Sequence, residues 1–222
     1  MNTFPRLRLR VGNPEKLTIY LAAQLHNLIP DQGMEADIEN IQAVLPNALI
    51  RMEPILAAVR NFETGVLDHY NALQHCTLVY LLSNEASTQH PCSTLADRLF
   101  CLNRAMHAID LFHRVQMPEV FFISHGLATV LGNANYGNRI VVFQNVTVGR
   151  VGENRPTIGS HVVLYPGATI TGNSVVGDGS VIAAGTVVHN TFIPPHSIVS
   201  QGPLGLLFTP CRRDYSLLYF NH

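Results

Sequence analysis

Aliphatic residues recur at every sixth position in the C-terminal half of the chain. A small residue usually follows four positions later, as at Ala168, Ser174, Ser180 and Thr186. The aliphatic positions are Ile158, Leu164, Ile170, Val176, Ile182 and Val188. A period of six matches neither the 3.6-residue repeat of a helix nor the alternation of a strand. It predicts a solenoid of stacked coils, in which three hexapeptides form one triangular coil.

The six-residue spacing extends upstream through Tyr136, Val142 and Val148, and then lengthens to ten residues before Ile158. We expect residues 150–156 to form a loop that leaves the solenoid, and such loops on rigid scaffolds often carry function. After Val188 the repeat decays. Residues 211–222 no longer follow it, and we expect them to pack along the coils or against a neighbouring subunit.

The N-terminal half has helical patterning. Asn13, Pro14 and Glu15 form a good helix start, with a capping residue, a proline at the first position and an early acid. Helices are predicted over about 14–28, 38–45, 50–62, 68–82 and 94–111. Pro46 is expected to interrupt the second and third, residues 84–92 are expected to form a loop, and Ser93 or Thr94 is expected to cap the last helix.

The composition changes from helix formers to Val, Ile, Gly and Asn after Glu119. This shift predicts an α+β fold in which an N-terminal helical domain precedes a β-solenoid. The expected divisions are a helical domain over 1–117, a β-helix domain over 118–202 and a C-terminal tail over 203–222.

The charges argue against nucleic-acid and membrane partners. Fourteen Lys and Arg face fifteen Asp and Glu in 222 residues, so no net basic field attracts anionic polymers or surfaces. Arg6, Arg8 and Arg10 form only a weak patch, and a solvated arm is the favoured interpretation. No apolar run approaches the ~18–20 residues that span a bilayer, and the first residues do not resemble a signal peptide. We therefore expect a cytoplasmic protein.

Cysteine and histidine spacing gives no metal-site signature. Cys76, Cys92, Cys101 and Cys211 lack CxxC spacing and are interpreted as reduced, mostly buried thiols. The eleven histidines include no HExxH motif. No metal is expected.

Several motifs together carry a family resemblance. They are Ser-His-Gly-Leu-Ala-Thr-Val-Leu-Gly at 124–132, Phe-Gln-Asn-Val-Thr-Val-Gly at 143–149, Arg-Pro-Thr-Ile-Gly at 155–159, Pro-Gly-Ala-Thr-Ile-Thr-Gly at 166–172 and Ala-Ala-Gly-Thr-Val-Val at 183–188. Over roughly residues 90–202 the chain resembles the serine O-acetyltransferases, hexapeptide-repeat enzymes with a left-handed parallel β-helix. The resemblance implies acetyl-CoA as acyl donor, a small-molecule acceptor and a homotrimer or hexamer.

His125 falls on the catalytic histidine of that family. A neutral imidazole, with an ordinary pKa near ~6.5, can remove a hydroxyl proton as the oxygen attacks a thioester. The alternative is a histidine packed at the start of the solenoid.

Three positions depart from the family pattern. His90 and Ser124 stand where the family has aspartates, and Arg155 stands where it has a second histidine. The carboxylates that would hold an ammonium are lost, and Arg155 suits a carboxylate or phosphate instead. L-serine is therefore in doubt as acceptor. The rivals are a sugar or nucleotide-sugar O-acetyltransferase and a catalytically silent solenoid that binds a partner.

By the same resemblance, the CoA arm is expected between neighbouring coils. The matching residues are Gly149, Pro166, Gly167, Ala183 and Ala184, and amides near Gly149 are candidate oxyanion donors. Small side chains let an extended arm approach the backbone, but ordinary corner geometry explains them equally well.

Overall fold

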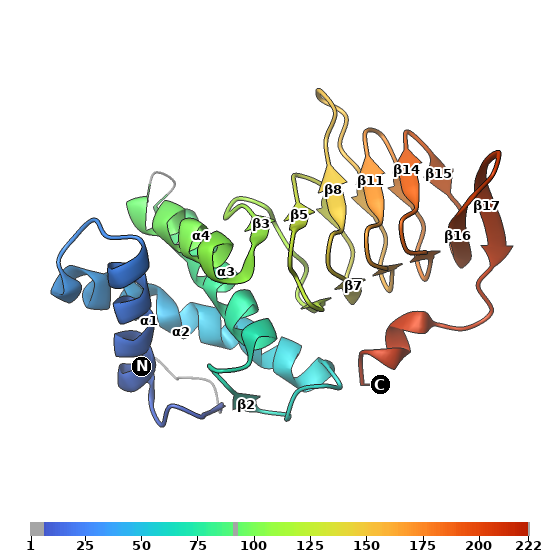
Figure 1. Ribbon diagram of the computed structural model, residues 1–222. Helices are drawn as coiled ribbons and strands as arrows, with labels where there is room; N and C mark the ends of the chain where they lie inside the picture. Colours follow the sequence, from blue (N-terminus) through green and yellow to red (C-terminus); the bar gives the residue numbers. More distant parts are fainter. Residues whose placement is uncertain (1–6, 91–92, 222) are drawn as a thin grey trace. The chain divides into compact units, whose positions relative to one another are not determined.

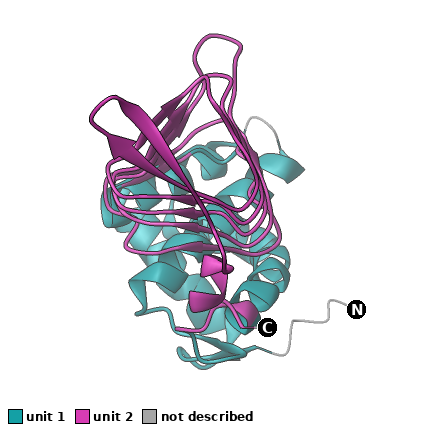
Figure 2. Cartoon of the chain, turned by 90° about the vertical axis from the view of Figure 1, so that its right-hand side faces the viewer, with its two compact units in different colours: residues 1–57, 62–108, 112–114 teal, residues 58–61, 109–111, 115–222 magenta. Residues whose placement is uncertain are grey.

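A computed structural model describes residues 7–90 and 93–221 and divides the chain into two compact units (Figures 1 and 2). We call residues 1–57, 62–108 and 112–114 the helical unit, and residues 58–61, 109–111 and 115–222 the solenoid unit. Arg6, Pro91 and Cys92 lie outside the described residues. None of the described helices is long and apolar enough to cross a membrane.

Four helices form most of the helical unit. They are α1 (Pro14–Leu28), α2 (Met34–Ala58, whose last residue belongs to the solenoid unit), α3 (Ala72–Gln89) and α4 (Thr94–His107). A short parallel pair joins β1 (Arg8–Leu9) to β2 (Val66–Leu67). The side chain of Asn13 accepts a hydrogen bond from Lys16 N at 2.9 Å, and Ser93 caps α4 by accepting from Ala96 N. Both predicted caps are therefore present.

The predicted break at Pro46 is wrong, because α2 runs without interruption through Pro46 and Pro54. Each proline removes one helical N–H donor, at a cost of about 3 kcal/mol. Side chains on both sides of Pro46 are almost completely buried and offset this cost by packing. They are Val44, Leu45, Ala48, Leu49, Met52, Ile55 and Leu56.

The predicted loop over 84–92 is also wrong up to Gln89, because α3 continues to that residue. Asn84 and Ser87 are buried, and Asn84 Nδ2 donates to the carbonyl of His113 at 2.6 Å. A polar segment forms a buried helix here because a tertiary contact satisfies its amide.

The last predicted helix ends earlier than expected, at His107. Ala108 adopts a left-handed conformation with φ 51°, and Ile109–Leu111 then form strand β3. The apolar residues Ile109 and Leu111 therefore belong to the solenoid, where they are buried.

The solenoid unit consists of three sheets of stacked, mostly parallel strands, which confirms the predicted fold class. Sheet I contains β4 (Phe121–Ile123), β7 (Ile140–Val142), β10 (Val163–Leu164), β13 (Val181–Ile182), β16 (Ser197–Gly202) and β17 (Gly205–Pro210). Sheet II contains β3, β5 (Thr129–Leu131), β8 (Thr147–Gly149), β11 (Thr169–Thr171) and β14 (Val187–His189). Sheet III contains β6 (Asn135–Tyr136), β9 (Thr157–Ile158), β12 (Val175–Val176) and β15 (Phe192–Ile193).

The six-residue repeat produces the interior of this solenoid. All six aliphatic positions from Ile158 to Val188 are at most 1% exposed, and the small residues from Ala168 to Thr186 are fully buried. Leu164 pairs with Ile182, one regular coil later. Val142 pairs with Leu164 across a coil that is four residues longer. The extra residues form the predicted loop, closed by a bridge between Val151 and Asn154.

The tail after β17 packs along the coils, the first of the two predicted alternatives. A short 3-10 helix (Tyr215–Leu218) places Ser216 Oγ 2.9 Å from His161 Nδ1. Further on, Tyr219 Oη lies 3.3 Å from Tyr165 Oη, and Arg139 Nη1 donates to the Asn221 carbonyl at 2.9 Å. Phe220 is fully buried. The tail thus covers part of sheet I.

Candidate functional site

His125 lies in the turn that connects β4 of sheet I to β5 of sheet II. We call the stack of such turns the I–II corner. In the next coils this corner contains Gln144, then Pro166 and Gly167, then Ala184 and Gly185. Backbone hydrogen bonds run along it, from Asn145 N to Leu127 O, from Gly167 N to Gln144 O and from Gly185 N to Pro166 O, at 2.9–3.1 Å. One edge of the solenoid therefore presents a continuous backbone ladder that begins beside His125.

The local chain holds His125 in an exposed, tightly turned position. His125 has φ 53°, and its carbonyl accepts from Leu127 N at 2.7 Å. Gly126 follows because a Cβ there would approach Ile123 Cγ2 to 2.8 Å. Left-handed backbone recurs at Asn145 and His161, so this conformation belongs to the corners and does not by itself mark His125. The exposed imidazole beside the ladder does distinguish it.

The structure brings together only part of the predicted site. Ser124 is buried next to His125, and Ala183 follows β13 at the same I–II corner as Pro166, Gly167 and Ala184. Gly167 has φ 75° with ordinary space around its Cβ position. Its backbone angle alone therefore accounts for the glycine.

Gly149 and Arg155 lie elsewhere in the coil. Gly149 ends β8, and Arg155 follows in the exposed loop that leads from sheet II to sheet III. Both are thus at a different corner from His125, across sheet II. The amides near Gly149 are not at the I–II corner, so the geometry of one chain does not support them as its oxyanion donors. His90 is an exposed residue that caps the C-terminal end of α3 in the helical unit.

Asp110 is a candidate that the sequence reasoning missed. It lies on β3, paired with Val130 of β5, and its side chain is half-buried. The neighbouring Ile109 Cδ1 is 3.4 Å from the Cβ position of Gly126, the residue after His125. The alternation Ile-Asp-Leu at 109–111 is typical of a strand. The apolar residues there also fit helical spacing, so the predicted helix over 94–111 includes them.

The helical unit contains a separate buried histidine pair. His75 Nε2 donates to Gln24 Oε1 at 2.9 Å, so its Nδ1 must accept from His107 Nε2 at 2.8 Å. Burial lowers the pKa of His75 to about 4, with a smaller contribution from the nearby His107. Burial also lowers the pKa of His107. Both rings are therefore neutral near pH 7, and their roles are explained by hydrogen bonding within the helices.

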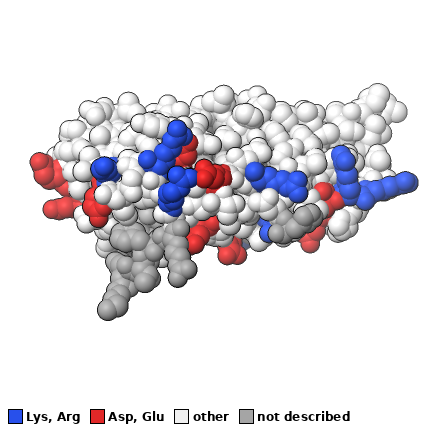
Figure 3. Space-filling view, turned by 90° about the horizontal axis from the view of Figure 1, so that it is seen from below, with Lys and Arg blue, Asp and Glu red and all other residues white. Residues whose placement is uncertain are grey.

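Possible metal ligands and free thiols are scattered through the described part of the chain. No cluster of three or more His, Cys, Asp or Glu side chains there could hold a metal ion. Cys76 and Cys211 are buried and Cys101 is exposed, all as free thiols. Burial raises the pKa of Cys76 to about 12, which makes it unreactive. On the face in Figure 3, Lys and Arg side chains are interspersed with Asp and Glu.

Comparison with known sequences agrees with the motifs. Residues 155–190 match the family described as bacterial transferase hexapeptide (six repeats). Serine acetyltransferase 2 of Arabidopsis thaliana is 31% identical over 215 residues, 94% of this chain and 63% of that protein. The serine acetyltransferase of Bacillus subtilis is 35% identical over 99 residues, 42% of this chain and 46% of that protein. The chain thus spans less than two thirds of the length of these curated relatives.

Comparison with solved structures supports the fold. The crystal structure of Neisseria gonorrhoeae serine acetyltransferase in complex with serine has a TM-score of 0.71 at 24% identity, covering 88% of this chain and 83% of that one. A serine acetyltransferase in complex with CoA has a TM-score of 0.69 at 22% identity, covering 87% and 84%. The chain therefore contains a segment that matches the hexapeptide-repeat family, and it is similar to serine acetyltransferases in sequence and fold.

Proposed function

We propose that this protein is an acetyl-CoA-dependent O-acetyltransferase that acetylates the hydroxyl of a small acceptor. The observation that carries the proposal is the exposed His125 at the start of the I–II corner. The same corner contains Pro166, Gly167, Ala183 and Ala184 in successive coils. The similarity to serine acetyltransferases supports the chemistry, and one of those solved structures contains CoA.

His125 acts as general base in this proposal. Its neutral imidazole takes the proton from the acceptor hydroxyl while the oxygen attacks the thioester carbonyl. The C–S bond then breaks, CoA leaves as the thiol, and the acetyl ester is the product. Because the hydroxyl attacks directly, no acyl-enzyme forms, and no cysteine of the chain takes part.

Asp110 is the best candidate for orienting His125. A carboxylate near an imidazole can fix its tautomer and stabilise the imidazolium that forms during proton transfer. β3 and β5 place Asp110 on the sheet that His125 leads into. Asp110→Asn should therefore lower kcat by about tenfold or more with little change in KM for acetyl-CoA. Glu153→Gln in the exposed loop is the control for loss of a carboxylate. Asp178→Asn in a later coil is less suitable, because Asp178 accepts a hydrogen bond from Ser160 N.

The proposed enzyme is a trimer, or a hexamer built from two trimers, in which Arg155 and His125 of different copies meet at one substrate. The two residues lie at different corners of one chain, so a shared substrate would need Arg155 from a second copy. The proposal also includes three divisions of the chain, a helical domain over 1–117, an acyltransferase domain over 118–202 and a tail over 203–222. It further includes a cytoplasmic location.

The acceptor is expected to differ from L-serine. His90 and Ser124 provide no carboxylate for an ammonium, and Arg155 is an exposed cation suited to a carboxylate or phosphate. These departures favour a sugar or nucleotide sugar as the acceptor. The second candidate function is therefore a sugar or nucleotide-sugar O-acetyltransferase.

An acceptor screen tests the proposal. Purified protein would be incubated with acetyl-CoA and L-serine, L-homoserine or a panel of sugars and nucleotide sugars, and release of free CoA thiol would be measured. We expect turnover with a sugar-type or anionic hydroxyl compound and little with serine. A serine kcat/KM at or above ~10⁴ M⁻¹s⁻¹ would contradict the acceptor assignment. No turnover with any acceptor, together with no acetyl-CoA binding, would favour the silent solenoid.

A further inference from the structure

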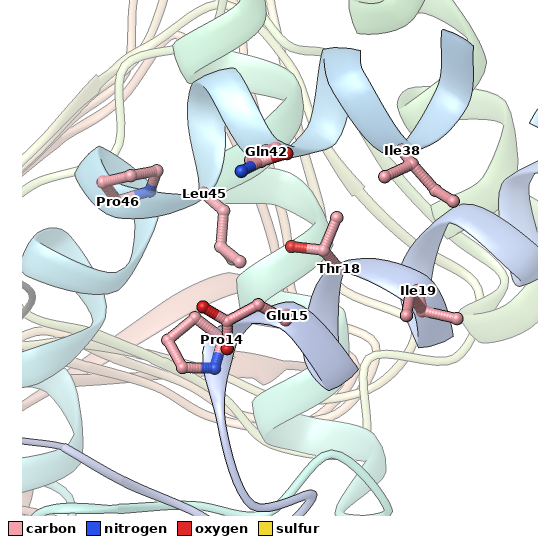
Figure 4. A pocket seen from close by; sticks show the side chains of 8 residues that line it. All are labelled: Pro14, Glu15, Thr18, Ile19, Ile38, Gln42, Leu45 and Pro46. Carbon is pink, nitrogen blue, oxygen red and sulfur yellow. The ribbon is translucent and has the colours of Figure 1, made fainter. Parts of the chain in front are cut away.

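The helical unit contains a cavity that the proposed acetyl transfer does not use. It lies between α1 and α2, has a volume of about 230 Å³ and is lined by residues of these two helices alone. Its apolar walls are Pro14, Ile19, Ile38, Leu45 and Pro46. Three polar residues, Glu15, Thr18 and Gln42, complete the lining (Figure 4). This combination of an apolar body and a few convergent polar groups is typical of small-molecule sites.

Thr18 offers one polar group to a ligand in this cavity. The residue is 4% exposed, and Figure 4 shows its hydroxyl pointing into the space between Glu15 and Leu45. Within the described residues this hydroxyl has no hydrogen-bond partner, whereas Thr77 and Thr88 each bond the carbonyl four residues earlier. The side chain is largely buried, but its oxygen is open to the cavity, so a bound ligand can take the place of water there.

The polar lining favours a hydrogen-bond donor with positive charge. Glu15 is the single ionisable residue of the lining, which contains no Lys, Arg or His, and no ion pair is found for it among the described residues. On the opposite helix, the Gln42 side chain adds an amide oxygen to the lining. Carboxylate, hydroxyl and carbonyl oxygens together match an ammonium group.

An anion at this helix start is less favourable. The first turn of α1 is already capped, because Asn13 accepts from Lys16 N and Pro14 has no N–H to offer. Glu15 also occupies the region where the helix dipole would stabilise a negative ligand. Repulsion by that carboxylate would oppose a second negative group.

We propose that the cavity between α1 and α2 binds a small primary ammonium compound with a short apolar chain. The ammonium donates to Glu15 and Thr18, and the apolar chain contacts Ile19, Ile38 and Leu45. A volume of about 230 Å³ suits a molecule of about ten non-hydrogen atoms or fewer. The site is independent of His125 and of the proposed acyl transfer.

Saturation-transfer NMR on the full chain tests the site with three probes of similar shape, n-butylammonium, 1-butanol and butyrate. We expect n-butylammonium to bind most tightly and butyrate most weakly. Glu15→Gln should weaken n-butylammonium binding by about tenfold, and Thr18→Val by about threefold to tenfold. Glu35→Gln is the matched control, because Glu35 is exposed in the first turn of α2 and outside the lining. It should change the affinity by less than twofold.

Glu15 is on the surface and Thr18→Val preserves shape, so both variants should fold, which circular dichroism would check. Equal binding of the three probes, or binding that survives Glu15→Gln, would overturn the proposal. It would also be overturned if no probe bound and Ile19→Glu changed the oligomeric state, because the cavity would then be part of an interface between copies. Acetyl-transfer activity has no bearing on any of these outcomes.

Discussion

At the scale of single residues, the structure makes His125 a sharp test of the proposed chemistry. His125→Asn keeps a similar size but cannot act as a base near neutral pH. We expect turnover to fall by ~10²–10⁴, while CoA affinity measured by calorimetry stays nearly unchanged, because the candidate CoA contacts are mainly with the backbone. A variant that keeps its activity would show that His125 is not the general base.

The buried His75 predicts how stability depends on pH. Its folded-state pKa of about 4 lies below the ordinary value of 6.5, so the unfolded chain binds the extra proton first. The contribution of His75 to the free energy of unfolding should therefore be complete above pH 6.5. It should be lost as the pH is lowered to about 4, which lowers the free energy of unfolding by about 3 kcal/mol at most. Chemical denaturation across this range would measure it. His75→Gln should flatten the slope, and the exposed His90→Gln should not.

At the scale of elements, close backbone contacts between coils explain one column of glycines. A Cβ at Gly137 would lie 2.3 Å from the backbone of Gly159, whereas a Cβ at Gly149 would meet nothing within 4 Å. Gly137→Ala should therefore cost about 2–3 kcal/mol or more in free energy of unfolding, since backbone atoms must move. Thermal denaturation of Gly137→Ala and Gly149→Ala compares the two directly. Equal stability of the variants would mean that the coils can separate at little cost.

At the scale of the whole molecule, the proposed contribution of Arg155 to the His125 site requires more than one copy of the chain. His125 and Arg155 occupy different corners of a solenoid whose surface exposes Val130, Val187 and Phe192. We expect light scattering to show a trimer or a multiple of three at micromolar protein. A stable, active monomer would show that Arg155 does not contribute to the His125 site.

The sequence by itself determined the solenoid, because a six-residue period leaves few other ways to bury Ile158 and its successors. It also determined the helix starts at Asn13 and Ser93, since capping depends on local hydrogen bonds. Tertiary structure alone decided that α2 passes Pro46, because packing on both sides outweighs a local penalty. It also decided that residues 109–111 form a strand, since Ile-Asp-Leu fits both periods until a neighbouring strand is present. For the same reason Asp110 was missed. Gly149 and Arg155 lie at a different corner of the coil from His125. Spacing along the chain does not reveal this separation.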